Sequence, residues 1–222
     1  MTAEENYFKY RNLVIKSQDR TFLAKREIYT LKFLLKNFYN YEVEKNLNIL
    51  DLGSGDKFLK SEIDLQGCNY FSLDINDINF ENEYFKFEKN KFDIVICLSV
   101  IEHLTDPNLF LSEIKRVLKN NGYLYIETPN WIYSKNIFYD DPTHKKPYTP
   151  KSLNFILKSH KFTNIKLFPN LRCKSKWYYF GKFNFLKARY LLPFRNDQKF
   201  IPSFLKGGSK GIFCISQKQD NE

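Results

Sequence analysis

The feature that most constrains the fold is a short apolar run at residues 47–55 that ends in an acid and two closely spaced glycines. The run, Leu-Asn-Ile-Leu-Asp-Leu, has the length of a buried strand. Gly53 and Gly55 then predict a tight turn in which the backbone approaches another group closely, because a Cβ there would collide with it. The residues after the turn can open a helix. A strand, a glycine turn and a helix place a ligand at the carboxyl end of a parallel strand.

Two familiar glycine motifs are excluded at this turn. A dinucleotide fingerprint requires a third glycine where Phe58 stands, and the Gly-Lys-Ser/Thr of a P-loop is absent. Asp51 instead lies two residues before the first glycine, where it would repel a pyrophosphate. An acid at this place suits a ligand with cationic or hydroxyl donors, such as the amino group of a methionine moiety.

A second acid follows the next apolar run. Residues 69–74 read as a short strand that ends in Asp74, which lies 19 residues after Gly55. An acid at this spacing, at the end of the neighbouring strand, can accept hydrogen bonds from both hydroxyls of a ribose. If the glycines served only to form a turn, without a ligand, the acid at the end of the next strand, Asp74, would remain unexplained.

Together these motifs resemble the class I S-adenosylmethionine-dependent methyltransferases. Residues 91–104 look like the fourth strand and following loop of that family, and residues 121–130 are similar to its fifth strand. The resemblance covers about residues 45–168. It implies an α/β, Rossmann-like sheet of seven strands with the last strand antiparallel, helices on both faces, and S-adenosyl-L-methionine as cofactor. Lys57 departs from the pattern, because many members have a further glycine there.

The resemblance lets us assign elements and cofactor residues. The strands are expected at 47–52, 69–74, 84–87 (an edge strand), 92–97, 123–128, 162–167 and 211–216, with one helix from Asp106-Pro107 to Asn121-Gly122 and another after Thr149-Pro150. The candidate cofactor-binding residues are Asp51, Gly53, Ser54, Gly55, Asp74, Ile75 and Leu98. Arg20, Lys25 or Arg26 could meet the cofactor carboxylate, although each also reads as surface charge. The acid that reads the adenine is left open among Glu81, Glu83 and Glu88.

Methyl transfer to an alcohol requires a group that removes a proton, and histidine is the natural base near neutral pH. The candidate catalytic residues are His144, in the loop after the fifth strand, and His103, after the fourth; a structural role for His103 is the alternative, and His160 is expected to be structural. Glu102 and Glu127, at strand ends, are further candidates for polar contacts. Asp140, Asp141 and His144 could hold a divalent cation as in some related O-methyltransferases, but acids before a proline turn usually cap it. We therefore predict no metal.

The 222 residues suit a single domain, with a helical cover at 1–40 and an aromatic, basic insertion at 170–210. The net charge of +10 is uneven: residues 1–142 carry a net −4 and residues 143–222 a net +14. This asymmetry indicates an anionic acceptor or surface, or merely a solvated basic face. The four scattered cysteines predict reduced thiols in a cytoplasmic protein. We find no signal peptide or membrane span, and the oligomeric state is not predicted.

The function that these patterns favour is O-methylation of a small polar acceptor. The block Asp-Pro-x-His…Pro-Tyr-Thr-Pro at 141–150 resembles a pattern in small-molecule methyltransferases, several of them from cell-surface glycan pathways. We therefore predict an anionic sugar-, nucleotide- or phosphate-linked acceptor of bacterial surface polysaccharide biosynthesis. The alternatives are a nucleic-acid methyltransferase, against which the Asn/Asp-Pro-Pro-Tyr/Phe motif is missing, and a non-catalytic binding subunit. We predict no nucleic-acid partner, while the basic, aromatic insertion leaves peripheral membrane contact open.

Overall fold

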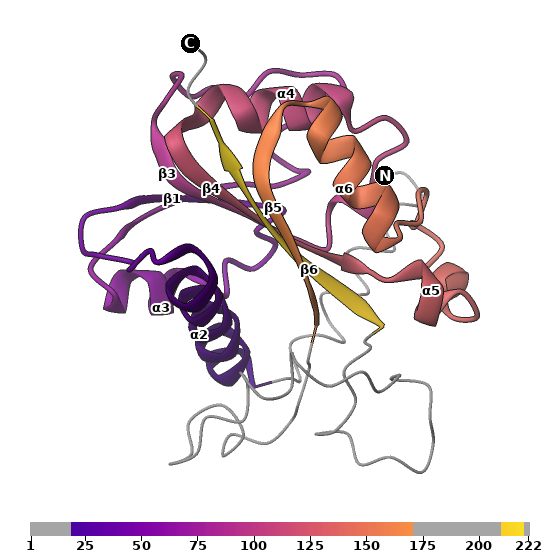
Figure 1. Ribbon diagram of the computed structural model, residues 1–222, viewed down its shortest axis with the longest axis horizontal. Coiled ribbons are helices and arrows are strands. Elements are labelled where there is room, and N and C mark those ends of the chain that lie inside the picture. Colours follow the sequence, from indigo (N-terminus) through magenta and orange to yellow (C-terminus); the bar gives the residue numbers. More distant parts are fainter. Residues whose placement is uncertain (1–18, 171–209, 220–222) are drawn as a thin grey trace.

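The computed structural model describes residues 19–170 and 210–219. They form three layers, with a sheet in the middle and helices on each side of it (Figure 1). Within this part of the chain the sheet has six strands in the order β2-β1-β3-β4-β6-β5, and only β6 runs antiparallel to its neighbours. The strands are β1 (Asn48–Leu52), β2 (Asn69–Leu73), β3 (Phe92–Leu98), β4 (Leu118–Pro129), β5 (Phe162–Pro169) and β6 (Gly211–Lys218). The predicted Rossmann-like architecture and its antiparallel last strand are confirmed, but the strand count is six rather than seven.

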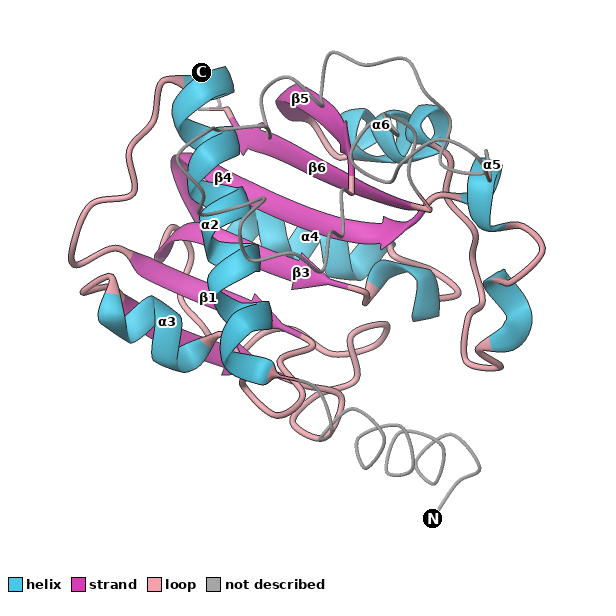
Figure 2. Ribbon diagram, turned by 90° about the horizontal axis from the view of Figure 1, so that it is seen from below, coloured by secondary structure: helices cyan, strands magenta, loops and turns pink. Residues whose placement is uncertain are grey.

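Helices cover both faces of the sheet. One face is covered by α2 (Arg20–Tyr39) and α3 (Lys60–Leu65), and the other by α4 (Asn108–Val117) and α6 (Pro150–Ser159) (Figure 1 and Figure 2). Three short elements follow the carboxyl ends of β3 and β4: η1 (Ile101–His103), α5 (Trp131–Ser134) and η2 (Phe138–Asp140). The loops that can carry chemistry therefore lie together at one edge of the sheet.

Each strand feeds two hydrophobic clusters, because successive side chains point to opposite faces. In β1, Ile49 packs in the cluster under α2 and α3, whereas Leu50 packs in the cluster under α4 and α6. A parallel sheet covered on both faces needs apolar residues at nearly every strand position, which explains the largely apolar runs in the sequence. Cys97 and Cys214 are buried free thiols inside strands, as predicted.

The edge strand predicted at 84–87 does not form, and this prediction is wrong. The backbone of this segment bonds to side chains of α4 instead of to a neighbouring strand. Phe85 N–H donates to Glu113 Oε2 at 2.7 Å, and Arg116 donates to the carbonyls of Phe85 and Phe87 at 2.9 and 2.8 Å. Arg116 and Glu113 also pair with each other at 2.7 Å. Long-range side-chain partners therefore satisfy the backbone groups that a strand would have paired with β2.

The helix expected from Asp106-Pro107 ends earlier than predicted. It stops at Val117, and β4 begins at once with Leu118 in an extended conformation. Asn121-Gly122 thus lies inside the strand rather than at a helix end. A Cβ on Gly122 would lie 2.9 Å from the Lys119 carbonyl oxygen and 3.1 Å from that of Asp93, so the glycine permits close approach of two backbones, near a register shift between β3 and β4.

The first described helix, α2, occupies the second half of the segment predicted to be helical. Asp19 caps it by accepting a hydrogen bond from Phe22 N–H at 3.0 Å, and Asn40 ends it in a left-handed conformation. The first half of the predicted cover and nearly all of the 170–210 insertion lie outside the described residues, so the predicted domain organisation stays a prediction. No helix among residues 19–170 and 210–219 is long and apolar enough to cross a membrane.

Candidate active site

The two glycines of the turn after β1 meet different surroundings. Gly53 has φ +70°, and a Cβ on it would lie 2.2 Å from Val100 Cγ2, so the close approach predicted for this glycine is to the loop after β3. Gly55 has φ +52°, and apart from its own chain neighbours no atom of the described chain lies within 4 Å of where its Cβ would be. Gly53 N–H donates to the Leu73 carbonyl at 2.8 Å, which ties the turn to the end of β2. Gly55 therefore leaves space at the carboxyl edge of the sheet.

Lys57, which stands where many related sequences have a glycine, adopts the glycine-like conformation. Its φ is +57°, in the left-handed region, and its N–H donates to the Ser54 carbonyl at 2.8 Å. A side chain in this region costs about 1–2 kcal/mol relative to right-handed backbone. The departure in sequence thus leaves the turn's backbone in a glycine-like shape and adds local strain.

Asp51 is a buried carboxyl group directly before the turn. Tyr70 OH donates to its Oδ2 at 2.8 Å. The pKa of Asp51 is raised to about 7, chiefly by burial; the Tyr70 hydrogen bond opposes this shift, and the nearby carboxylates of Asp74 and Asp56 add to it. A cationic group brought to this place would stabilise the ionised form of the acid.

The end of β2 lies beside this turn. The register pairs Asp51 with Ser72 and Leu52 with Leu73, so Asp74 follows directly where the turn begins. Asp74 is half-buried, and its N–H donates to Asp77 Oδ2 at 2.8 Å, which holds the acid at the strand end. Ile75 is half exposed beside it. The structure thus brings together the residues that the sequence assigned to the methionine and ribose ends of a cofactor.

The start of α2 packs on the far side of the turn. Arg20 pairs with Asp56 at 2.7 Å and lies 4.9 Å above the Phe58 ring, an ion pair combined with a cation–π contact. These residues line an open groove between α2 and α3. Arg26 pairs with Glu27 at 2.6 Å. Two of the three cations considered for a cofactor carboxylate are therefore held by acids of the chain itself.

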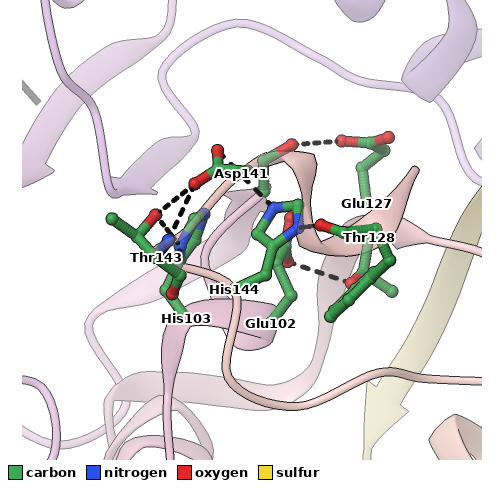
Figure 3. Close-up of polar contacts among 9 residues, drawn as sticks. Glu102, His103, Glu127, Thr128, Asp141, Thr143 and His144 are labelled. Carbon is green, nitrogen blue, oxygen red and sulfur yellow. Dashed lines mark hydrogen bonds and ion pairs between the residues drawn. The ribbon is translucent and has the colours of Figure 1, made fainter. Parts of the chain in front are cut away.

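The second part of the site forms where η1 meets the loop after η2. The N–H groups of Lys145 and Lys146 donate to the Glu102 carbonyl at 2.8 and 3.0 Å, which fixes the loop against η1. His103 and His144, some 40 residues apart in sequence, then have ring centroids 4.8 Å apart (Figure 3). The two histidines predicted to be catalytic are brought together, whereas His160 caps the end of α6, at the start of β5.

Hydrogen bonds fix which nitrogen of each imidazole carries the proton. His103 Nδ1 lies 3.1 Å from the Thr143 carbonyl and 2.9 Å from Thr143 Oγ1, whose own proton goes to Asp141 Oδ1 at 2.6 Å. His144 Nδ1 lies 2.6 Å from the Phe138 carbonyl. A carbonyl oxygen only accepts, so both Nδ1 atoms are donors. In the neutral imidazoles the lone pair that can take a proton or bind a cation is therefore on Nε2.

Carboxylates complete this cluster. Glu102 is fully buried, and its Oε2 accepts from Thr128 Oγ1 at 2.9 Å. One ligand atom from each of Glu102, His103 and His144 lies within 4.8 Å of the others. Asp141 Oδ2 lies 3.8 Å from His144 Nε2, whereas Asp140 is exposed in η2. The grouping thus differs from the Asp140–Asp141–His144 set that the sequence suggested.

Glu127 joins three strands at the same edge. It accepts from Ser99 Oγ and from Asn170 Nδ2, both at 2.7 Å (Figure 3 draws Glu127). Ser99 follows Leu98 at the end of β3 and has φ +55°. Glu127 was predicted from the sequence as a polar contact. Ser99 and Asn170 were not predicted, because they lie 28 and 43 residues from Glu127 in the sequence. Thr143 was missed for the same reason: its contact is with His103, 40 residues away.

Comparison with known proteins agrees with this geometry. The methyltransferase-domain family matches residues 22–167, which is 146 of the 222 residues. The ubiquinone biosynthesis O-methyltransferase of Pelagibacter ubique is 27% identical over 112 residues, which cover 42% of this chain and 47% of the relative. The chain thus spans about half the length of the curated relatives it matches.

Solved structures show the same fold. A SAM-dependent methyltransferase from Archaeoglobus fulgidus has 22% identity and a TM-score of 0.58, with 89% of this chain and 99% of that chain covered. Phosphoethanolamine N-methyltransferase 2 of Haemonchus contortus, in complex with S-adenosyl-L-methionine, has 17% identity and a TM-score of 0.53 over 85% of this chain and 52% of that one. At these identities the likeness concerns the fold.

The sheet, the glycine turn after β1 and the acid at the end of β2 define the class of S-adenosylmethionine-dependent methyltransferases. The chain belongs to the methyltransferase-domain family. The predicted class and its cofactor, S-adenosyl-L-methionine, are confirmed at this level.

Proposed function

We propose that the protein transfers a methyl group from S-adenosyl-L-methionine to a hydroxyl of a small acceptor. The residues fit the cofactor: Gly55 leaves space at the turn, Asp51 offers a buried carboxyl to a cationic amino group, and Asp74 offers an acceptor to ribose hydroxyls. Ser54, Ile75 and Leu98 flank these positions on the same turn and strand ends. The bound cofactor supplies an electrophilic methyl group, and the chain supplies orientation and proton transfer.

The observation that carries the oxygen-directed reaction is the His103–His144 pair. Both imidazoles have their Nδ1–H engaged by backbone carbonyls, which directs the Nε2 lone pairs to the proton-accepting role. His144, in the loop after β4, is the proposed base, and His103 shares the pocket. An amine acceptor can be methylated without such a base, because its neutral form already carries a nucleophilic lone pair. A pair of oriented imidazoles therefore favours a hydroxyl acceptor.

The acceptor we propose is a polar sugar-, nucleotide- or phosphate-linked molecule of surface polysaccharide biosynthesis. Its support is the basic character of residues 143–222 and the 141–150 block. The curated relatives favour a second candidate, because several are O-methyltransferases of ubiquinone biosynthesis. Acceptors of both kinds thus belong in one screen.

The test begins with calorimetric binding of S-adenosylmethionine and S-adenosylhomocysteine, with NADH as a control ligand. Formation of S-adenosylhomocysteine is then followed for nucleotide-linked sugars, sugar phosphates and hydroxylated ubiquinone precursors, in the presence of a chelator. His144→Asn should lose turnover and keep cofactor affinity, whereas His160→Asn should keep both. Full turnover in both His144→Asn and His103→Asn would refute the base assignment, and selective NADH binding would refute the cofactor site.

A further inference from the structure

We propose that Glu102, His103 and His144 form a binding site for a divalent cation of borderline character, for which Zn²⁺ is the best match. No metal was predicted from the sequence, and the acids considered there as ligands included Asp140, which is exposed. The three residues come together only through the packing of the loop after η2 against η1. This proposal does not depend on the methyl acceptor or on the catalytic role of the histidines.

The two imidazole rings are oriented as metal-binding histidines are. Histidines that bind metals usually donate the N–H of the other ring nitrogen to a carbonyl or carboxylate, which fixes the ring and makes the ligating nitrogen more basic. Both histidines here have this arrangement: His103 Nδ1 donates to Thr143, and His144 Nδ1 donates to the Phe138 carbonyl. Thr143 in turn donates to Asp141, so the support of His103 extends to a second carboxylate.

The distances between the possible ligand atoms also fit a metal site. A tetrahedral zinc site with bonds of about 2.0–2.1 Å places its ligand atoms about 3.4 Å apart. One possible ligand atom from each of the three residues lies within 4.8 Å of those of the other two. A pair at that limit would have to close by about 1.4 Å to complete such a tetrahedron. Asp141 Oδ2, 3.8 Å from His144 Nε2, lies where it can add a further oxygen ligand.

The chemistry of the donor atoms favours Zn²⁺. Two imidazole nitrogens and one or two carboxylates form a set that suits Zn²⁺ and other late divalent ions, whereas Mg²⁺ prefers an octahedron of oxygens. The cation would also offset the cost of burying the Glu102 carboxylate, which is fully enclosed and accepts from Thr128. We therefore expect binding in the order Zn²⁺ above Mg²⁺.

Occupancy has a chemical consequence for the same residues. A lone pair on Nε2 cannot bind a cation and accept a proton at the same time. Zn²⁺ in excess is therefore expected to suppress methyl transfer that uses the imidazoles as bases, and a chelator is expected to restore it. Stimulation by Zn²⁺ would instead indicate that a metal-activated hydroxyl replaces the imidazole base, and it would still support the proposed metal site.

The experiment that decides the site measures metal binding to the full chain after treatment with a chelator, without cofactor. Calorimetry with ZnCl₂ should give one tight site, and Co²⁺ should give the visible absorption of a four- or five-coordinate nitrogen and oxygen site. His103→Asn and His144→Asn keep an amide donor near the position of Nδ1 but remove Nε2, so each should weaken Zn²⁺ at least tenfold. Glu102→Gln should weaken it as well, and His160→Asn serves as the matched control.

Three results would overturn the proposal. They are the absence of a stoichiometric site, equal affinity in the double variant His103→Asn/His144→Asn, and a strong thiolate charge-transfer band with Co²⁺, which would place the metal on cysteine. Circular dichroism and the midpoint of thermal unfolding confirm that each variant is folded. Binding of S-adenosylmethionine is measured on the same samples, so failure of the cofactor site and failure of the metal site are distinguished.

Discussion

Replacement of Asp51 by asparagine should make the ligand-free protein more stable at high pH. The Asp51 carboxyl is buried, and its pKa is raised to about 7, from 3.8, chiefly by desolvation. Between these two values the folded state holds a proton that the unfolded state has released. The contribution of Asp51 to the free energy of unfolding therefore falls as the pH rises from about 4 to 7. Asparagine is neutral throughout and keeps an oxygen that can accept from Tyr70.

The size of the effect follows from the shift. About 1.4 kcal/mol per pH unit over a shift of about 3 units gives a penalty of about 4 kcal/mol for ionised Asp51 well above pH 7. At pH 5 the penalty is about 2 kcal/mol, because only part of the interval has been crossed. The stability difference between Asp51→Asn and the natural chain should thus grow by about 2–3 kcal/mol from pH 5 to pH 8. For a chain of this size that is about 5–10 °C in Tm.

Urea or thermal unfolding at pH 5, 6, 7 and 8 measures this difference. Tyr70→Phe is the matched comparison: it removes the hydrogen bond that opposes the shift, so the stability of that variant should continue to fall to higher pH. A difference between Asp51→Asn and the natural chain that is constant from pH 5 to pH 8 would refute the reasoning from desolvation. The same carboxylate should favour a cationic ligand, so affinity for S-adenosylmethionine should rise with pH over this window and lose that dependence in Asp51→Asn.

Three further substitutions test the turn and the strand end. Lys57→Gly should raise the free energy of unfolding by about 0.5–1 kcal/mol, measured by urea titration, because it relieves left-handed strain at φ +57°. Gly53→Ala should lower it by about 2–4 kcal/mol in the same assay, because its Cβ would lie 2.2 Å from Val100 and its φ is positive; an unchanged midpoint would contradict this packing. Asp74→Ala should weaken S-adenosylmethionine about 10–100-fold in calorimetry with little change in stability, and unchanged affinity would remove Asp74 from the cofactor site.

The sequence by itself determined the framework of the protein. The apolar runs at residues 47–52, 69–74 and 92–97 predicted the strands β1, β2 and β3, which are neighbours in the sheet, because a sheet covered on both faces needs apolar residues at nearly every position. The glycine turn predicted a ligand site at the carboxyl end of β1, since the requirement for glycine acts over a few adjacent residues, and that site stays a prediction. Such local patterns can be recognised without knowledge of what lies across the molecule.

The tertiary structure decided what depends on distant partners. Segment 84–87 carries apolar residues at strand spacing, yet its backbone hydrogen-bonds to Glu113 and Arg116 of α4 instead of to a neighbouring strand. His103 and His144 could be named from the sequence, but their tautomers depend on carbonyl groups that only the folded loop brings near. Glu102, next to His103 in sequence, enters the same cluster only because that loop packs on η1. The physical reason is common to these cases: the free energy of a buried polar group depends on the partner it meets, and that partner is chosen by the fold.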